Sequence, residues 1–245
     1  NNRRLVLTAN NVAGNTLPAE PYFMHTIGNY FKSRINPGYA INVGNSQLPT
    51  YLYSSAYDKG EGYTSAEIST GNSLSTEFNN LFVATGGPDA KIKIAVSGNA
   101  LYPRYTRVRV NKDSILRFPV DFYNYAVDSA TFPVSKITAN SADIEVANIC
   151  NLETCVTADK MVIHQYELTY PRLFNFGNAT SFEFSLPASP AGNYLEIRGF
   201  NNPSGGAVRL IDLTNGHFYV GHLTTPGVVK IVLQPSAAPR QLVVH

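Results

Sequence analysis

The 245-residue sequence contains no tryptophan, only two cysteines, and no run of about eighteen apolar residues. The missing apolar run excludes a membrane-spanning helix, so we expect a protein that does not span a membrane. The first residues, Asn1-Asn2-Arg3-Arg4, are neither a signal peptide nor an initiator methionine. They predict an internal piece of a longer protein, or a mature chain whose leader has been removed.

Charged residues are scarce as well, at 15% of the sequence, and neither sign predominates. The 19 Lys and Arg residues stand against 17 Asp and Glu residues, which gives a formal net charge of +2, and the two signs are mixed along the chain. A nucleic-acid surface needs clustered positive charge. The sequence therefore predicts no nucleic-acid partner.

The two cysteines, Cys150 and Cys155, are separated by four residues. This spacing fits neither a zinc knuckle nor the two-residue spacing of a redox pair. We expect instead a disulfide between Cys150 and Cys155 that closes the tip of a hairpin. Half of a metal site or a redox pair remains the alternative interpretation.

Helical periodicity is almost absent, because Gly, Pro or Asn interrupts every stretch long enough for a helix. Period-two alternation of apolar and polar residues takes its place, and it predicts strands with one buried face. The pattern recurs at Ile92/Ile94/Val96, Val108/Val110, Ile144/Val146, Phe182/Phe184/Leu186, Leu195/Ile197 and Val229/Ile231/Leu233. We therefore predict an all-β protein.

Two local patterns refine this prediction. Asn215-Gly216 predicts a hairpin with a type I′ turn, because both residues accept a positive φ. The segment 160–170 predicts a strand that is apolar on both faces, with Met161 and Ile163 on one face and Val162 and Tyr166 on the other. Pro171 is expected to end this strand, since proline cannot donate to the sheet ladder.

The pattern divides the chain into two β domains. Residues 1–172 are expected to form a sandwich, in which residues 1–57 contribute lead strands and loops. Residues 173–245 are expected to form a smaller β-sandwich unit. The lead segment alternates well but has too few strands to hold a core alone.

No catalytic or metal site is predicted, and no cofactor. None of the five histidines forms a pair with metal-ligand spacing, and His164 is interpreted as a hydrogen-bonded structural residue inside a strand. Its pairing with Cys150 or Cys155 lacks the glycine-rich turn that exposes a nucleophile. Calcium in a loop such as Gly87-Pro88-Asp89 has no dense Asp/Asn repeat to support it.

Tyrosines are the candidate binding residues. Tyr57, Tyr63, Tyr102 and Tyr105 are expected to offer aromatic surface to a sugar or a peptide. Two observations favour packing instead: tyrosine is a common strand residue, and tryptophan, which stacks on sugars most strongly, is missing.

Three segments resemble the region that precedes the peptidase domain in gingipain-type cysteine peptidases, especially the sortase of the bacterial type IX secretion system. The first runs from Pro21-Tyr22-Phe23-Met24-His25 to Lys59-Gly60-Glu61-Gly62-Tyr63. The second is Met161 to Arg172, and the third is Val208-Arg209-Leu210-Ile211-Asp212-Leu213-Thr214. The order and separation of all three agree with the family.

The resemblance implies a jelly-roll-like β-sandwich followed by a smaller β unit, in a secreted, periplasmic or cell-surface protein. It also implies that the catalytic His and Cys lie beyond His245, so no catalytic residue falls within this chain. The expected function is to support or orient the downstream peptidase domain, or to dock exported proteins. The alternative is a carbohydrate-binding or adhesion module with glycan partners.

Overall fold

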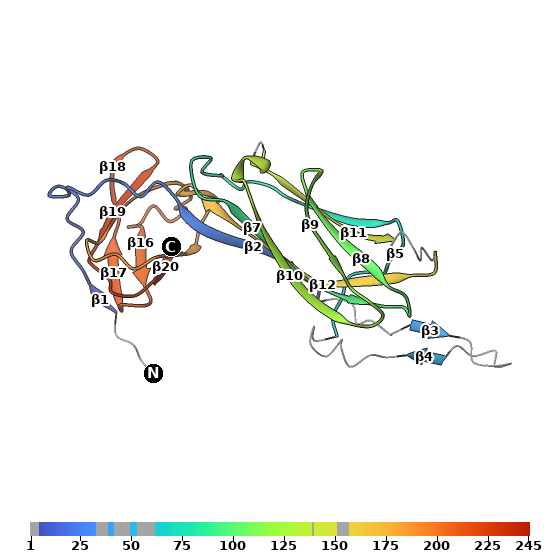
Figure 1. Ribbon diagram of the computed structural model, residues 1–245. Helices are drawn as coiled ribbons and strands as arrows, with labels where there is room; N and C mark the ends of the chain where they lie inside the picture. Colours follow the sequence, from blue (N-terminus) through green and yellow to red (C-terminus); the bar gives the residue numbers. More distant parts are fainter. Residues whose placement is uncertain (1–4, 33–38, 42–49, 53–61, 139, 151–156) are drawn as a thin grey trace. The chain divides into compact units, whose positions relative to one another are not determined.

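The computed structural model describes residues 5–32, 39–41, 50–52, 62–138, 140–150 and 157–245. Regular structure in these residues is almost entirely strand, with one 3-10 turn, η2 (Val134–Lys136). The prediction of an all-β fold is confirmed (Figure 1). No helix in the described ranges is long and apolar enough to cross a membrane.

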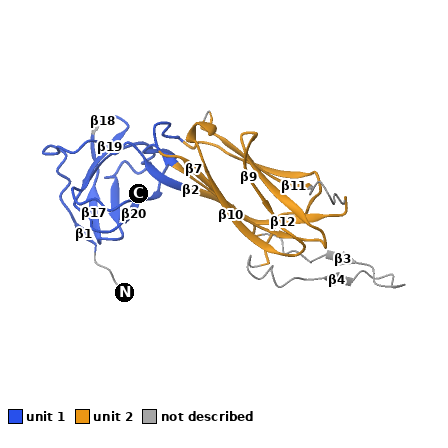
Figure 2. Cartoon of the chain, viewed as in Figure 1, with its two compact units in different colours: residues 1–25, 82–87, 171–245 blue, residues 26–81, 88–170 orange. Residues whose placement is uncertain are grey.

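The chain forms two compact units (Figure 2). Unit 1 comprises residues 1–25, 82–87 and 171–245, and unit 2 comprises residues 26–81 and 88–170. The sequence division at residue 172 assigns residues 1–57 to the first domain, whereas in the structure residues 5–25 belong to the same unit as the C-terminal part. Whether either unit folds as an independent domain stays a prediction.

Two sheets build unit 2. One has the order β10-β7-β12-β2 with β5 added on β12, and the other has the order β6-β11-β8-β9. The strands of the first sheet are β2 (Phe23–Tyr30), β5 (Ile68–Ser69), β7 (Ala90–Gly98), β10 (Tyr125–Phe132) and β12 (Lys160–Arg172). Those of the second are β6 (Ser73–Phe78), β8 (Arg104–Val110), β9 (Asp113–Pro119) and β11 (Ala142–Cys150).

Apart from β5, the strands of these two sheets are β2 and β6 to β12, and their order in space is that of a jelly roll. In such a fold, most strands that follow one another in the chain lie in different sheets, as β2 and β6 or β11 and β12 do here, while β8 and β9 are neighbours in one sheet. A separate antiparallel pair, β3 (Tyr39–Ile41) and β4 (Thr50–Leu52), completes the unit. The jelly-roll-like sandwich expected from the resemblance therefore agrees with the observed topology.

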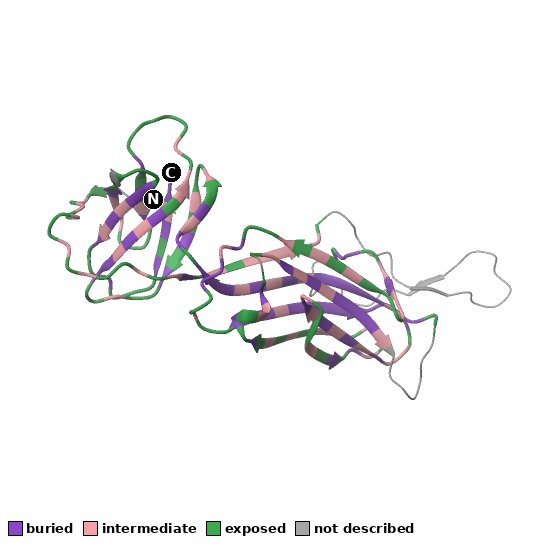
Figure 3. Cartoon of the chain, turned by 90° about the horizontal axis from the view of Figure 1, so that it is seen from above, coloured by how far each residue is buried: buried purple, intermediate pink, exposed green. Residues whose placement is uncertain are grey.

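Period-two burial explains why these segments are strands. Ile92, Ile94 and Val96 of β7 are fully buried, while Lys91 and Lys93 face outward. Figure 3 shows buried positions alternating with more exposed ones along the strands. The same alternation buries Val108 and Val110 of β8 and Ile144 and Val146 of β11. Apolar area removed from water on these inner faces supplies the main stabilisation of the sandwich.

Strand β12 departs from the predicted alternation. Its register against β7 shifts between Ile163 and Gln165, so His164 is the extra residue of a β-bulge. The bulge turns Tyr166 to the same face as Ile163, and the predicted assignment of the two to opposite faces is wrong. The prediction that Pro171 ends the strand is also wrong, because β12 extends to Arg172.

Unit 1 has two sheets of its own, with orders β1-β17-β16-β20-β14 and β13-β15-β19-β18. The first comprises β1 (Val6–Leu7), β14 (Phe182–Leu186), β16 (Arg209–Asp212), β17 (His217–Val220) and β20 (Arg240–Val244). The second comprises β13 (Asn175–Ala179), β15 (Asn193–Phe200), β18 (His222–Thr225) and β19 (Val228–Leu233).

A cluster of phenylalanines lies at the centre of unit 1. The rings of Phe176 and Phe182 stack with centroids 4.2 Å apart, and the Phe23 ring lies 5.0 Å from Phe174 and 5.2 Å from Phe184. Such aromatic pairs add to the stabilisation from buried area. Phe23 is the residue through which the N-terminal segment joins this core.

The predicted Asn215-Gly216 hairpin is confirmed, but its turn type is wrong. Strands β16 and β17 are joined by a four-residue loop, since Asp212 pairs with His217. Gly216 has a φ of +72°, whereas Asn215 is not among the residues with a positive φ. The Asp212 carboxylate accepts the backbone N–H groups of Thr214 and Asn215 at 3.1 and 2.9 Å, which favours the longer loop.

Gly98, at the end of β7, provides a test of packing in unit 2. A Cβ at this position would lie 1.7 Å from the Phe122 carbonyl oxygen and 1.8 Å from Nη1 of the buried Arg104. We expect Gly98→Ala to lower the free energy of unfolding by about 3 kcal/mol or more. Gly86→Ala is the matched control, because its added Cβ meets no atom within 4 Å. Denaturant unfolding measures both, and equal stability of the two variants would contradict the packing described.

His25 predicts a pH dependence in unit 1. Burial, aided by the positive charge of Arg172, lowers the pKa of His25 from 6.5 to about 4. Between these values the unfolded chain binds a proton that the folded chain does not, so stability falls as pH drops from 6.5 toward 4. We expect the free energy of unfolding of His25→Gln to fall by about 1–2 kcal/mol less than that of the native chain over this pH range, allowing for the partial exposure of His25.

Unfolding curves at neutral pH and near pH 4.5 measure this effect, with His222→Gln at an exposed position as the control for replacing a histidine. An unchanged pH dependence in His25→Gln would show that the ring gains its proton equally in both states.

Candidate functional site

The structure places the candidate tyrosines in separate environments. Tyr63 is 37% exposed, Tyr102 lies half-buried in the segment between β7 and β8, and Tyr105 lies half-buried on β8. No ring contact joins any two of these three tyrosines. Tyr57 lies outside the described residues. A binding role for these tyrosines stays a prediction.

Tyr105 has a neighbour that the sequence did not reveal. The guanidinium of Arg117, on β9, lies 4.2 Å from the centroid of the Tyr105 ring. This distance is a close cation–π contact, so one face of the ring is covered. The neighbouring Tyr102 contributes its backbone carbonyl, which accepts the Phe122 N–H at 3.1 Å.

The predicted disulfide cannot be compared with the structure. Cys155 and the side chain of Cys150 lie outside the described residues, so the bond stays a prediction. In the described ranges, no group of three or more His, Cys, Asp or Glu side chains is arranged to hold a metal ion.

The strongest arrangement of reactive groups pairs Ser97 with His164. Ser97 Oγ lies 2.7 Å from Nε2 of His164, and the opposite ring nitrogen, Nδ1, lies 3.1 Å from the Tyr63 carbonyl oxygen. A carbonyl oxygen only accepts, so Nδ1 carries the proton and Nε2 accepts from the serine hydroxyl. This is the orientation in which a histidine activates a nucleophile.

Burial decides what this pair can do. Ser97 is 0% exposed and His164 is 5% exposed, so a substrate cannot approach the hydroxyl. The bonds instead satisfy two buried polar side chains at the bulge of β12, where an unpaired group would be costly. The interpretation of His164 as a hydrogen-bonded structural residue agrees with this geometry. The serine partner was not predicted, because the two residues are 67 positions apart.

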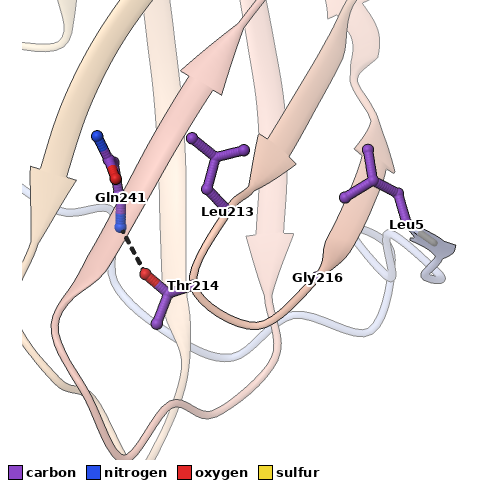
Figure 4. Close-up of a pocket in the computed structure, with 5 residues that line it drawn as sticks. All are labelled: Leu5, Leu213, Thr214, Gly216 and Gln241. Atoms are coloured by element: carbon purple, nitrogen blue, oxygen red, sulfur yellow. Dashed lines mark hydrogen bonds between the residues drawn. The ribbon is translucent and has the colours of Figure 1, made fainter. Parts of the chain in front are cut away.

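Unit 1 contains a pocket of 510 Å³ lined by Leu5, Leu213, Thr214, Gly216 and Gln241. Figure 4 shows a hydrogen bond between two of these lining residues: the backbone N–H of Gln241 donates to Thr214 Oγ1 at 3.0 Å. The Gln241 side-chain amide is bound as well, to the Glu183 carboxylate. None of the described residues that line the pocket has an ionisable side chain, so these residues offer apolar contact through Leu5 and Leu213 rather than acid–base chemistry.

Sequence comparisons identify no relative, since no family model and no curated protein matches the chain. Among solved structures, the chain is similar to dimeric latent PorU from Porphyromonas gingivalis, with a TM-score of 0.62 and 8% identity. The match covers 98% of this chain and 22% of the PorU chain, so this chain spans about a fifth of that protein.

Carbohydrate-binding modules are more distant. The CBM36-1 domain of a multidomain xylanase from the hindgut metagenome of Trinervitermes trinervoides has a TM-score of 0.34, at 7% identity, over 59% of this chain and 95% of its own. A CBM36 module in complex with calcium and xylotriose has a TM-score of 0.32, at 9% identity, over 59% and 98%. Similarity this low carries no argument, whereas the PorU match shows a shared fold.

Proposed function

We propose that this chain is a non-catalytic β module of a larger secreted or surface protein of the gingipain-like or sortase-like type. In this role the module supports or orients a catalytic domain, or docks protein substrates. The observation that carries the proposal is the likeness to latent PorU, which extends over 98% of this chain but only 22% of the PorU chain. The chain thus has the fold of a part of that protein.

Two residues of the segments that resemble the family, Arg172 and Asp212, support this proposal, because their side chains stabilise the fold. Arg172 donates to the Asn175 carbonyl and lies 5.1 Å from the centroids of Phe82 and Phe182. Asp212 is fully buried and holds the loop between β16 and β17. Side chains locked in this way give the rigidity that a supporting or docking module requires.

The module's location and partners follow from the same proposal. It belongs in a secreted, periplasmic or cell-surface protein, beside a peptidase domain of the same polypeptide. Its further partners are exported proteins. The sandwich supplies rigid strands and loops for these contacts, and the chemistry resides in the neighbouring domain.

Three measurements test the proposal. The coding sequence should continue beyond His245 into a Cys/His peptidase domain, and the purified chain should show neither peptidase nor transpeptidase activity. In the full-length protein, Gly98→Ala should lower peptidase activity by destabilising the module, whereas Gly86→Ala should not. A stop codon soon after His245, or activity in the isolated chain, would refute the proposal.

A second candidate, carbohydrate binding, is favoured by one surface of unit 2. Tyr30 is 45% exposed on the outer face of the β10-β7-β12-β2 sheet and donates to the Glu167 carboxylate at 2.5 Å. The hydroxyls of Thr26 and Thr169 lie on the same face, 2.8 Å apart. An aromatic ring among hydrogen-bonding side chains is a common way to bind a sugar.

A glycan array distinguishes this candidate. If the chain binds glycans through the outer face of this sheet, Tyr30→Ala should reduce the signal at least about tenfold. A loss on replacing Tyr102 and Tyr105 instead would place the site at the tyrosines predicted from sequence. An array without any bound glycan would rule out this function for the glycans it displays.

A further inference from the structure

The outer face of β8 and β9 concentrates positive charge. Val108 and Val110 point into the core of unit 2, so the alternate residues Tyr105, Arg107 and Arg109 face outward. On the neighbouring strand, Arg117 is exposed beside them. We call these four residues, Tyr105, Arg107, Arg109 and Arg117, the arginine face.

Two of the arginines oppose each other across the strands. Arg107 of β8 is the direct partner of Arg117 of β9. Like charges directly opposite in an antiparallel pair are destabilising. No carboxylate in the described part of the chain pairs with Arg117, whose guanidinium is held instead over the Tyr105 ring. The fold thus keeps an unfavourable pair on its surface.

Arg107 and Arg109 form ion pairs with one and the same carboxylate. Oε1 of Glu145, on β11, lies 3.1 Å from Nη2 of Arg107 and 3.4 Å from Nη1 of Arg109. Two guanidiniums therefore share one carboxylate and Arg117 has none, which leaves a surplus of two positive charges among the described residues of this face. The Nε–H groups of Arg107 and Arg109 are buried and meet no acceptor in the described residues.

Two further acids of this sheet lie on β6 and β11, while Asp113, the first residue of β9, pairs with Lys136. Asp143 of β11 and Glu77 of β6 pair with each other across those two strands. The sheet surface therefore has an acidic side over β6 and β11 and a basic side over β8 and β9. The surplus of positive charge is on the basic side.

We propose that the arginine face docks an extended acidic segment of a partner protein. Alternate side chains of an extended peptide repeat at about 6.8 Å, the spacing that Arg107 and Arg109 share along β8. Aspartate or glutamate at every second position would thus meet successive guanidiniums, which bind carboxylates through paired N–H donors. The contact of Arg117 with the Tyr105 ring holds one guanidinium in place and covers a ring face that a sugar would need.

The sequence offers no free segment of alternating acids that would fit this face. Among the 17 acids of the sequence, only Asp143 and Glu145 stand two positions apart, and Glu145 is already bound to Arg107 and Arg109. In a second copy the same Glu145 would be engaged in the same way. A separate acidic protein therefore fits better than either this chain or its copy.

The proposed function includes docking of protein substrates, and the arginine face specifies that the docked segment is acidic. This inference therefore rests on the proposed function. Its test uses only the purified chain and a peptide. A chain that is encoded beside a peptidase but binds no acidic peptide would keep the proposed function and refute the arginine face.

The probe is a fluorescein-labelled peptide of alternating Glu and Ser, with fluorescence anisotropy as the measurement. We expect binding that weakens as salt is raised, and a loss of affinity of at least about tenfold in Arg107→Gln/Arg117→Gln. Arg209→Gln, at an exposed strand arginine of unit 1, is the matched control and should bind as the native chain does. Equal loss in the control, or no binding to the native chain, would overturn the proposal.

Competitors settle the class of partner. A peptide of alternating Lys and Ser should not bind. If polygalacturonate binds through the same arginines and the acidic peptide does not, the partner is a polysaccharide and the proposal fails. If sedimentation shows self-association that Arg107→Gln/Arg117→Gln abolishes, the occupant is a second copy and the proposal fails as well.

Arg117→Glu separates binding from folding. It replaces the like-charge pair with an attraction between Arg107 and the introduced carboxylate, so the melting temperature should stay equal or rise while peptide affinity falls at least about tenfold. A variant with lower stability and unchanged peptide affinity would show that Arg117 serves the fold and not a partner.

Discussion

The buried ion pair between Arg104 and Asp159 fixes one end of the jelly roll. Arg104 uses all five N–H donors of its guanidinium: Nε and Nη2 donate to the Asp159 carboxylate at 2.6 to 2.8 Å, Nη1 to the carbonyls of Val120 and Phe122 at 2.8 Å, and Nη2 also to Ala100 at 3.0 Å. Removing either charge would leave its partner buried and uncompensated, at a cost of about 3–5 kcal/mol.

This pair also sets the surface of unit 2. Because Arg104 is the first residue of β8 and points inward, strand alternation turns Tyr105, Arg107 and Arg109 outward. Gly98 must lack a side chain for the same reason, since the Arg104 guanidinium occupies the space beside it. The buried Arg104 side chain therefore holds the loop carbonyls, requires a glycine at position 98 and fixes which residues of β8 face outward.

Unit 1 uses the same device. Nη1 of Arg240 lies 3.4 Å from Oδ2 of Asp212, and both side chains are 0% exposed. Asp212 accepts two backbone N–H groups of the following loop, and Arg240 also donates to the Gln234 carbonyl. Each unit thus holds its loops with a buried Arg–Asp pair, although Nε of Arg240, unlike the donors of Arg104, meets no acceptor in the described residues.

Sequence reasoning found what depends on local periodicity. The alternation at Ile92, Ile94 and Val96 identified a strand and its buried face, and similar patterns identified the all-β class. The bulge at His164 was missed because one added residue reverses the alternation without changing composition. The Arg104–Asp159 pair spans 55 positions, and only tertiary structure brings such residues together. The binding tyrosines and the Cys150–Cys155 disulfide stay predictions.

The arginine face was within reach of sequence reasoning only in part. Arg107 and Arg109 alternate with Val108 and Val110, so their outward orientation follows from the pattern. That Arg117 stands opposite Arg107 depends on the strand register, which the bulge between β8 and β9 shifts. This irregularity falls between Val108 and Arg109, next to the Arg107–Arg117 pair, so the alternation of β8 alone does not predict that pair.

Fold similarity cannot say which surface of a β module is used, but charge can. On the outer face of the β10-β7-β12-β2 sheet, Lys93 lies 3.7 Å from the Glu167 carboxylate, so that pair of charges is matched within the chain. On β8 and β9, Arg107 and Arg109 share the single carboxylate of Glu145, and Arg117 pairs with no carboxylate in the described residues. A scaffold selected for stability alone would gain by replacing Arg117, because a neutral or acidic residue there removes a repulsion. Retaining the surplus at one surface is therefore better explained by an acidic partner than by the requirements of the fold.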